Sequence, residues 1–245
     1  MICGSFTLSA QCPGGGGGTT TSVTTSVTQS INSSAGGFGS YSNGMAGLSA
    51  VGISQSQSNK LVYSDLKGSP YLNEEPTKGT LVLNNGKKVD NYLLQLDLHT
   101  NQAIATLSNG DEIFINSELI KEIAIPHDGE LLVFKKTNPD RPDRFYQVLY
   151  EDAGMVFFKD RRATITDPVR NGIADRDGQI RHSNRYFISQ GEGQIAKVKL
   201  KKKDVFSSFI DDEVYAMKEY AKKKGIKFSN EQDYVEVFEG VAAND

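Results

Sequence analysis

Seven basic side chains stand close together in the second half of the chain, in a segment that holds only four acidic ones. The basic residues are Lys159, Arg161, Arg162, Arg170, Arg176, Arg181 and Arg185, and the acidic residues are Asp160, Asp167, Asp175 and Asp177. Seven positive against four negative charges leave this segment at +3, whereas the whole chain carries −3. A guanidinium group matches phosphate and carboxylate oxygens with paired hydrogen bonds. The six arginines are therefore candidate ligand-binding residues for an anionic group.

The segment 159–185 is predicted to be a long loop between two strands. Loops of this length are often functional. Its ligand would be an anionic envelope component, such as a lipid phosphate, a peptidoglycan carboxylate or an acidic envelope protein. The alternative is a solvated loop whose opposite charges pair with one another.

No other residues form a pattern typical of catalysis or metal binding. His99, His127 and His182 lie in predicted loops or turns and lack the spacing of zinc or protease motifs. The stretch 175–178 alternates carboxylates before a glycine, as calcium loops do. Asn184 stands where an EF-hand needs a glutamate, so a tight Asp-Gly turn is expected instead. We expect no catalytic residue, no metal and no cofactor.

Residues 60–202 consist of short apolar segments separated by turn residues, the pattern of antiparallel β structure. The clearest hairpin has segments 80–83 and 87–89 on either side of Asn84-Asn85-Gly86, because Asn-Gly tolerates the positive φ of tight turns. Leu94, Leu96 and Leu98 share one face of the next strand, opposite Gln95 and Asp97. Further predicted strands are 61–63, 103–107, 112–115, 120–125, 131–135, 145–150, 155–159, 185–188 and 195–200.

About ten strands at such close spacing predict a mainly β (α+β) fold, an antiparallel meander that forms a sandwich or a partly open barrel. Lys197, Lys199 and Lys201 alternate with apolar residues, which predicts a lysine-protected edge or a solvent-facing strand. These lysines lack interleaved aromatic residues, and the net charge is negative, so no nucleic-acid partner is expected.

The C-terminal residues 203–239 change to a helical period. A short helix at 203–209 is followed by a longer one that begins at Asp211-Asp212-Glu213 and ends before Gly225. Its apolar stripe is Val214, Met217 and Ala221. Ser229 and Gln232 predict a capping box for a last helix. We expect two or three helices packed on one end or edge of the sheet.

Residues 1–59 contain no charged residue and no histidine. Residues 1–10 are small and apolar and end in Leu-Ser-Ala, which predicts the remnant of a secretory signal peptide. Gln11 suits a lipid attachment at Cys12 poorly. Residues 11–59 are rich in Gly, Ser and Thr and predict a disordered linker. The alternative is a strand-forming patch, because Val23, Val27 and Ile31 would share one strand face. No apolar run reaches the roughly 20 residues of a membrane-spanning helix.

The stretch Gly68-Ser69-Pro70-Tyr71-Leu72, followed by Lys78-Gly79-Thr80 and a glycine-turn hairpin, resembles uncharacterised secreted proteins of Bacteroidota. The tail is similar too, with a lysine-rich strand at 198–203, an Asp-started helix and Lys-Lys-Gly-Ile-Lys-Phe before a final helix. The resemblance covers roughly residues 64–238 and implies an envelope location and a β-rich domain. It supplies no catalytic residues.

Together these features predict a secreted or periplasmic module of the cell envelope, without enzymatic activity, tethered by its N-terminal tract. Its partner would be an envelope protein or an anionic envelope component. Two alternatives stay open. One is an enzyme that acts on envelope polymers through loop carboxylates, and the other is a cell-surface adhesin that uses the Thr/Ser tract.

Overall fold

The computed structural model describes residues 63, 66–138, 140–152, 154–168, 177–191 and 194–243. The predicted leader, the predicted linker and most of the predicted strand 61–63 lie outside these residues, and so do Arg170, Arg176 and Asp175. The described strands are β1 (Thr77–Leu83), β2 (Lys88–Asp97), β3 (Gln102–Thr106), β4 (Glu112–Phe114), β5 (Ile120–His127), β6 (Glu130–Lys135), β7 (Tyr146–Asp152), β8 (Met155–Thr166), β9 (Gln179–Gln190) and β10 (Gln194–Val198). The helices are η3 (Ser117–Leu119), α2 (Lys202–Phe206), α3 (Asp211–Lys224) and α4 (Glu231–Ala242).

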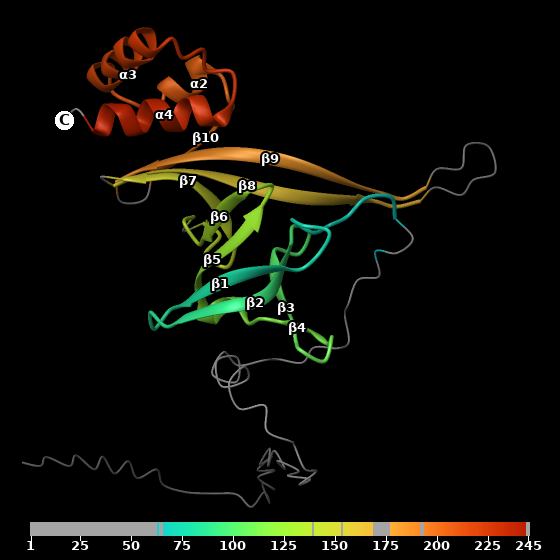
Figure 1. The fold of residues 1–245 in the computed structure, drawn as a ribbon. Coiled ribbons are helices and arrows are strands. Elements are labelled where there is room, and N and C mark those ends of the chain that lie inside the picture. Colours follow the sequence, from blue (N-terminus) through green and yellow to red (C-terminus); the bar gives the residue numbers. More distant parts are fainter. Residues whose placement is uncertain are drawn as a thin grey trace, which may run out of the picture. The chain divides into compact units, whose positions relative to one another are not determined.

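The ten strands form one open antiparallel sheet in the order β10-β9-β8-β7-β6-β5-β1-β2-β3-β4 (Figure 1). Two runs of consecutive hairpins, β1–β4 and β5–β10, meet where β5 pairs with β1. The predicted mainly β meander with C-terminal helices is therefore confirmed. The predicted Asn-Gly hairpin is confirmed as well, because β1 pairs with β2 across a turn in which Gly86 has φ 81°.

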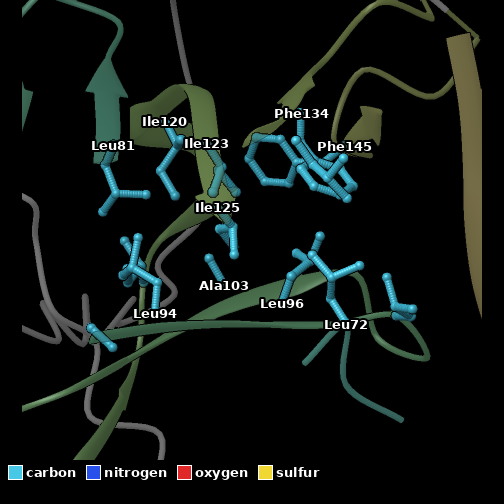
Figure 2. Close-up of a cluster of buried hydrophobic side chains, with 14 of the residues drawn as sticks. Leu72, Leu81, Leu94, Leu96, Ala103, Ile120, Ile123, Ile125, Phe134 and Phe145 are labelled. Carbon is cyan, nitrogen blue, oxygen red and sulfur yellow. The ribbon is translucent and has the colours of Figure 1, made fainter. Parts of the chain in front are cut away.

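The larger core lies between strands β1 to β6. Leu94 and Leu96 of β2 are completely buried, and Leu98 directly after the strand is nearly so, which confirms the predicted apolar face. In Figure 2, side chains of β1, β5 and β6 point toward those of β2 and β3. Gly79 permits this packing, since a Cβ there would lie 2.7 Å from the Ala124 carbonyl oxygen.

The smaller core lies between the helices and strands β7 to β10. Met217 and Ala221 of α3 are buried there, together with Phe157, Ile188 and four residues of α4. The helices therefore cover one face at one end of the sheet (Figure 1). Gly225 closes α3 in the left-handed region at φ 72°, as its position predicted.

Segment 66–72 connects two distant parts of the sheet. Lys67 forms a parallel bridge with Gln179 at the start of β9, and Tyr71 forms an antiparallel bridge with Asp97 at the end of β2. Beside it, the Ala163 N–H donates to the Leu98 carbonyl at 3.2 Å. The β2–β3 turn is thereby fixed against β8.

Three local predictions were wrong. The segment 159–185 is not one long loop, because 159–166 and 179–185 belong to β8 and β9, which pair from Met155↔Gln190 to Thr166↔Gln179. His127 and His182 lie in strands rather than loops. The α4 cap is Asn230, one residue later than predicted, and its side chain accepts from the Asp233 N–H. The first two errors concern the type of element, and the third concerns the position of the cap by one residue.

Candidate functional site

The β8–β9 ribbon separates the predicted arginines onto two faces. Consecutive strand residues point to opposite faces, and directly paired residues share one. Arg162, Arg181 and Arg185 therefore share a face with Asp160, which we call the arginine face. Arg161 lies on the opposite face with Phe157, Lys159 and Tyr186, which we call the helix face because α4 packs there. The structure thus brings three of the six predicted arginines together and excludes Arg161.

On the arginine face, Asp160 is completely buried between two arginines. Arg144 Nε donates to Asp160 Oδ1 at 2.8 Å, and Arg162 Nε donates to Asp160 Oδ2 at 2.5 Å. The side chains of Arg144 and Arg162 keep 14% and 24% of their surface exposed, so both remain partly accessible to solvent. A buried carboxylate that binds both Nε atoms fixes the direction of each guanidinium group. Asp160 therefore orients Arg144 and Arg162.

The other cations of this region are exposed. Arg141, Arg181 and Arg185 form no ion pair within the part of the chain that the structure describes. Arg181 donates to the neighbouring Gln179 side chain at 3.2 Å. Exposed arginines that neutralise no carboxylate remain available for an external anion.

The helix face holds a different ionic cluster. Lys159 Nζ donates to Glu231 Oε1 of α4 at 2.6 Å, and Tyr186 donates to Glu231 Oε2 at 3.0 Å. Arg161 Nε donates to the Gln147 side chain at 2.7 Å. Burial lowers the pKa of Lys159 and of Arg161, and burial with the adjacent Glu231 raises the pKa of Tyr186 to about 12. Lys159 and Tyr186 form hydrogen bonds with Glu231, and these bonds join α4 to the sheet.

A pocket of about 190 Å³ opens next to Arg144. Its lining residues are Thr100, Asn101, Gln102, Ser117, Arg141, Asp143 and Arg144. Two guanidinium groups, two hydroxyls and two amides supply donors, and Asp143 is the one carboxylate of the lining. Ligand pockets for whole small molecules run to roughly 300–1,000 Å³. This pocket is therefore of a size for one anionic group rather than a large ligand.

Hydrogen bonds of the backbone position the pocket walls. Asp97 Oδ1 accepts from the N–H groups of His99 and Thr100, at 2.7 and 3.0 Å, and so shapes the β2–β3 turn. The buried Asn101 side chain accepts from the Phe145 N–H at 2.7 Å and donates to the Phe145 carbonyl at 3.1 Å. This pair of bonds holds the turn against the residue after Arg144. The part of the pocket formed by residues 100–102 is thus fixed to the part that contains Arg144.

Arg141 and Arg144 were missed by sequence reasoning. The signal for them is the repeat Asp140-Arg141-Pro142-Asp143-Arg144 directly before a predicted strand. Each arginine follows an aspartate, so the stretch has no net charge and does not stand out as basic. Only the fold shows that Arg144 uses Asp160, a residue 16 positions away, rather than Asp143 as its carboxylate partner.

The three histidines each have a different hydrogen-bond partner. His99 Nδ1 lies 3.1 Å from the Ala163 carbonyl oxygen, His127 Nδ1 lies 2.5 Å from Asn73 Oδ1, and His182 Nε2 lies 2.6 Å from the Ser69 carbonyl oxygen. Across the described ranges no group of three or more His, Cys, Asp or Glu side chains is placed to hold a metal ion. The same ranges contain no helix with the length and apolarity needed to cross a membrane.

Comparisons with family models, with curated proteins and with solved structures found no match for this chain. The resemblance to secreted proteins of Bacteroidota therefore stays a prediction. The function of the protein is accordingly inferred from the chemistry of the pocket and the arginine face.

Proposed function

We propose that this protein is a binding module of the cell envelope that has no enzymatic activity and binds a phosphate or carboxylate group of an envelope component. The pocket beside Arg141 and Arg144 would take the anionic group. The exposed Arg181 and Arg185 on the arginine face would contact further anionic groups of the same partner. The uncharged front of the chain supports the envelope part of this proposal, because it is typical of an exported and tethered protein.

The observation that carries the proposal is the orientation of Arg144 by a buried carboxylate. A guanidinium group that is already fixed loses little side-chain entropy when it binds a ligand. Arg141 in the same pocket is exposed and, among the described residues, pairs with no carboxylate. A fixed cation beside a free one, with hydroxyl and amide donors around them, is an arrangement suited to a two-oxygen anion.

The structure also changes which variants can test the anion hypothesis. Reversing the charge of Arg161 or Arg162 would break contacts inside the fold, with Gln147 and with Asp160 respectively. Arg141 has no such contact among the described side chains, so Arg141→Glu is the informative substitution. Lys218→Glu on the exposed side of α3 makes the same change in net charge away from the pocket and is the matched control.

The first measurement is a titration of the full chain with inorganic phosphate and, separately, with acetate, monitored by NMR at the amides of Thr100 and Gln102. One charge-assisted hydrogen bond contributes about 1.5–3 kcal/mol, so Arg141→Glu should weaken binding by roughly tenfold to a hundredfold. Lys218→Glu should leave it close to the parent value. Equal affinity of the two variants would refute the pocket as the binding site.

The second measurement is co-sedimentation of the same three proteins with isolated envelope fractions at low and at physiological salt. Binding through exposed arginines should weaken as salt rises, because screening at 0.15 M acts beyond about 8 Å. If Arg141→Glu still sedimented as well as the parent at low salt, an envelope ligand of this pocket would be excluded. The phosphate and acetate titrations then decide whether the acceptor resembles a phosphate or a carboxylate.

A further inference from the structure

Strands β8 and β9 carry a row of polar side chains on the arginine face. The two strands pair side by side over their full length, and four of their paired positions lie on this face between Asp160 and Thr166 (Figure 1). We call these residues the polar row: Asp160 with Arg185, Arg162 with Ser183, Thr164 with Arg181, and Thr166 with Gln179. The one carboxylate of the row, Asp160, is completely buried, and none of the eight residues is apolar. The accessible part of the row is therefore cationic and hydrophilic.

The three arginines of the polar row follow one another at even steps. Arg185 lies opposite Asp160, Arg162 comes two positions later in β8, and Arg181 lies opposite a residue two positions later still. Two residues of an extended strand advance about 7 Å, so the row places a cation about every 7 Å over a length of about 14 Å. A small anion can bind at only one of these positions. A linear polymer with an anionic group on each repeat can bind at all three.

The polar row is open to solvent and adjoins the pocket. Strand β9 exposes residues 181–185 in succession. The two arginines among them form no ion pair with any residue that the structure describes. Arg144 connects the two regions, because it lines the pocket and binds Asp160, the first residue of the row. One extended ligand can therefore occupy the pocket and the row together.

The residues between the arginines indicate the class of polymer. Thr164, Thr166 and Ser183 supply hydroxyl groups, and Gln179 supplies an amide. Hydroxyl and amide groups both donate and accept hydrogen bonds, so they suit the hydroxyl groups of a sugar, which do the same. Guanidinium groups suit carboxylates. The alternation of the two kinds of side chain thus matches a chain of sugars that carry carboxylates.

Other classes of polyanion fit the polar row less well. Single-stranded nucleic acids are bound through bases that stack on aromatic side chains. The row contains no aromatic residue, and the next pair on this face, Phe158 and Phe187, stack on each other with 5.3 Å between ring centroids. An anionic lipid would need an apolar surface for its chains. An acidic peptide strand gains affinity from main-chain hydrogen bonds at a sheet edge, whereas the row lies on a sheet face.

We propose that the anionic partner is an acidic polysaccharide, a linear glycan that carries a carboxylate on successive sugar units. The inference rests on the proposed function, because the pocket beside Arg144 holds the first carboxylate. Arg185, Arg162 and Arg181 hold carboxylates of the following sugar units, and the side chains between them bind sugar hydroxyls. The ligand thus lies along the β8–β9 ribbon.

The test compares galacturonic acid with its linear octamer in calorimetric titrations of the full chain. The monomer occupies one position at a time, whereas the octamer spans the pocket and the polar row. Arg181→Gln combined with Arg185→Gln removes two exposed cations, each of which contributes about twofold to fivefold in affinity. The affinity of the octamer relative to the monomer should therefore fall about tenfold. Lys218→Gln combined with Lys223→Gln makes the same change in net charge on α3 and should leave this ratio at the parent value.

The outcomes separate the polar row from the pocket. A ratio that is equal in the parent and in the double arginine variant would overturn the row as a binding surface, even where Arg141→Glu abolishes monomer binding and so supports the pocket. If the monomer did not bind but the octamer affinity still fell in the double arginine variant, the row would be supported and the pocket refuted. Octamers of thymidylate or of glutamate that bound the parent as tightly as the galacturonic acid octamer would overturn the assignment to a polysaccharide.

Discussion

Lys159 and Asp160 are neighbours in the sequence, and both are buried and ion-paired, yet they serve opposite faces of the same strand. Lys159 is 2% exposed and binds Glu231, a residue of the last helix. Asp160 is 0% exposed and binds Arg144 and Arg162, whose side chains are partly exposed. The first pair joins two layers of the fold. The second fixes two cations at a surface.

Two consecutive residues of one strand can therefore have different roles, because they face opposite sides of the sheet. One role is structural and the other concerns binding. On the helix face, Lys159, Arg161 and Glu231 each bind another group of the fold. On the arginine face, one buried carboxylate serves two arginines, and three more arginines nearby remain exposed. Exposed arginines that form no ion pair among the described residues therefore lie on or near the arginine face. Substitutions of the carboxylate in each cluster can test whether the two differ in this way.

The largest effect is expected for Asp160→Ala. Removal of this carboxylate leaves Arg144 and Arg162 partly buried without a counter-charge, which should lower the free energy of unfolding by about 3–5 kcal/mol. Urea unfolding monitored by circular dichroism measures the loss. Thr164→Ala, an exposed position on the same face, should change stability by less than about 0.5 kcal/mol. A loss below about 1 kcal/mol for Asp160→Ala would mean that the carboxylate does not hold the arginines.

The helix face should be less sensitive and should allow compensation. Glu231→Gln leaves Lys159 buried without its counter-charge, at a cost of about 2 kcal/mol, because Glu231 is 30% exposed and water can partly replace it. Adding Lys159→Met removes the buried charge, so the double variant should regain most of the loss. Glu236→Gln on the exposed side of α4 is the control. If the double variant were less stable than Glu231→Gln, the pair would not be a purely structural link.

The strand pattern was predictable because it depends on local signals. The Asn84-Asn85-Gly86 turn and the alternating leucines of β2 act over a few residues, and both predictions hold in the structure. The extent of β8 and β9 was not predictable in this way. Residues 160–166 and 179–185 are mostly polar and resemble a loop, and they form strands because they pair with each other over seven of the twelve paired positions of β8 and β9.

The candidate site depends on contacts that local patterns do not contain. The pairing of Arg144 with Asp160 spans 16 positions, and the bonds between Asn101 and Phe145 span 44. The arginine-rich composition drew attention to a segment in which Arg162, Arg181 and Arg185 share one face of two paired strands. It could not separate Arg161 from them, because the strand register that decides the face was hidden by the loop prediction.

The smallest effect is expected for His127, which lies beside the helix-face cluster. Burial lowers its pKa, the cations Arg161 and Lys159 lower it further, and Asp128 and Glu130 oppose the change. A folded pKa below the unfolded value of about 6.5 means that the unfolded chain takes up the proton first. The contribution of neutral His127 is therefore present in full above about pH 6.5 and is lost as the pH falls toward 5.

Urea midpoints measured from pH 7.5 to 5 should show a shallower pH dependence for His127→Gln than for the parent chain. The difference should stay below the ~1.4 kcal/mol of a full one-unit shift, because the ring is partly exposed. An unchanged slope would show that the positive charge of the helix face does not extend to His127, and that Glu231 neutralises it locally.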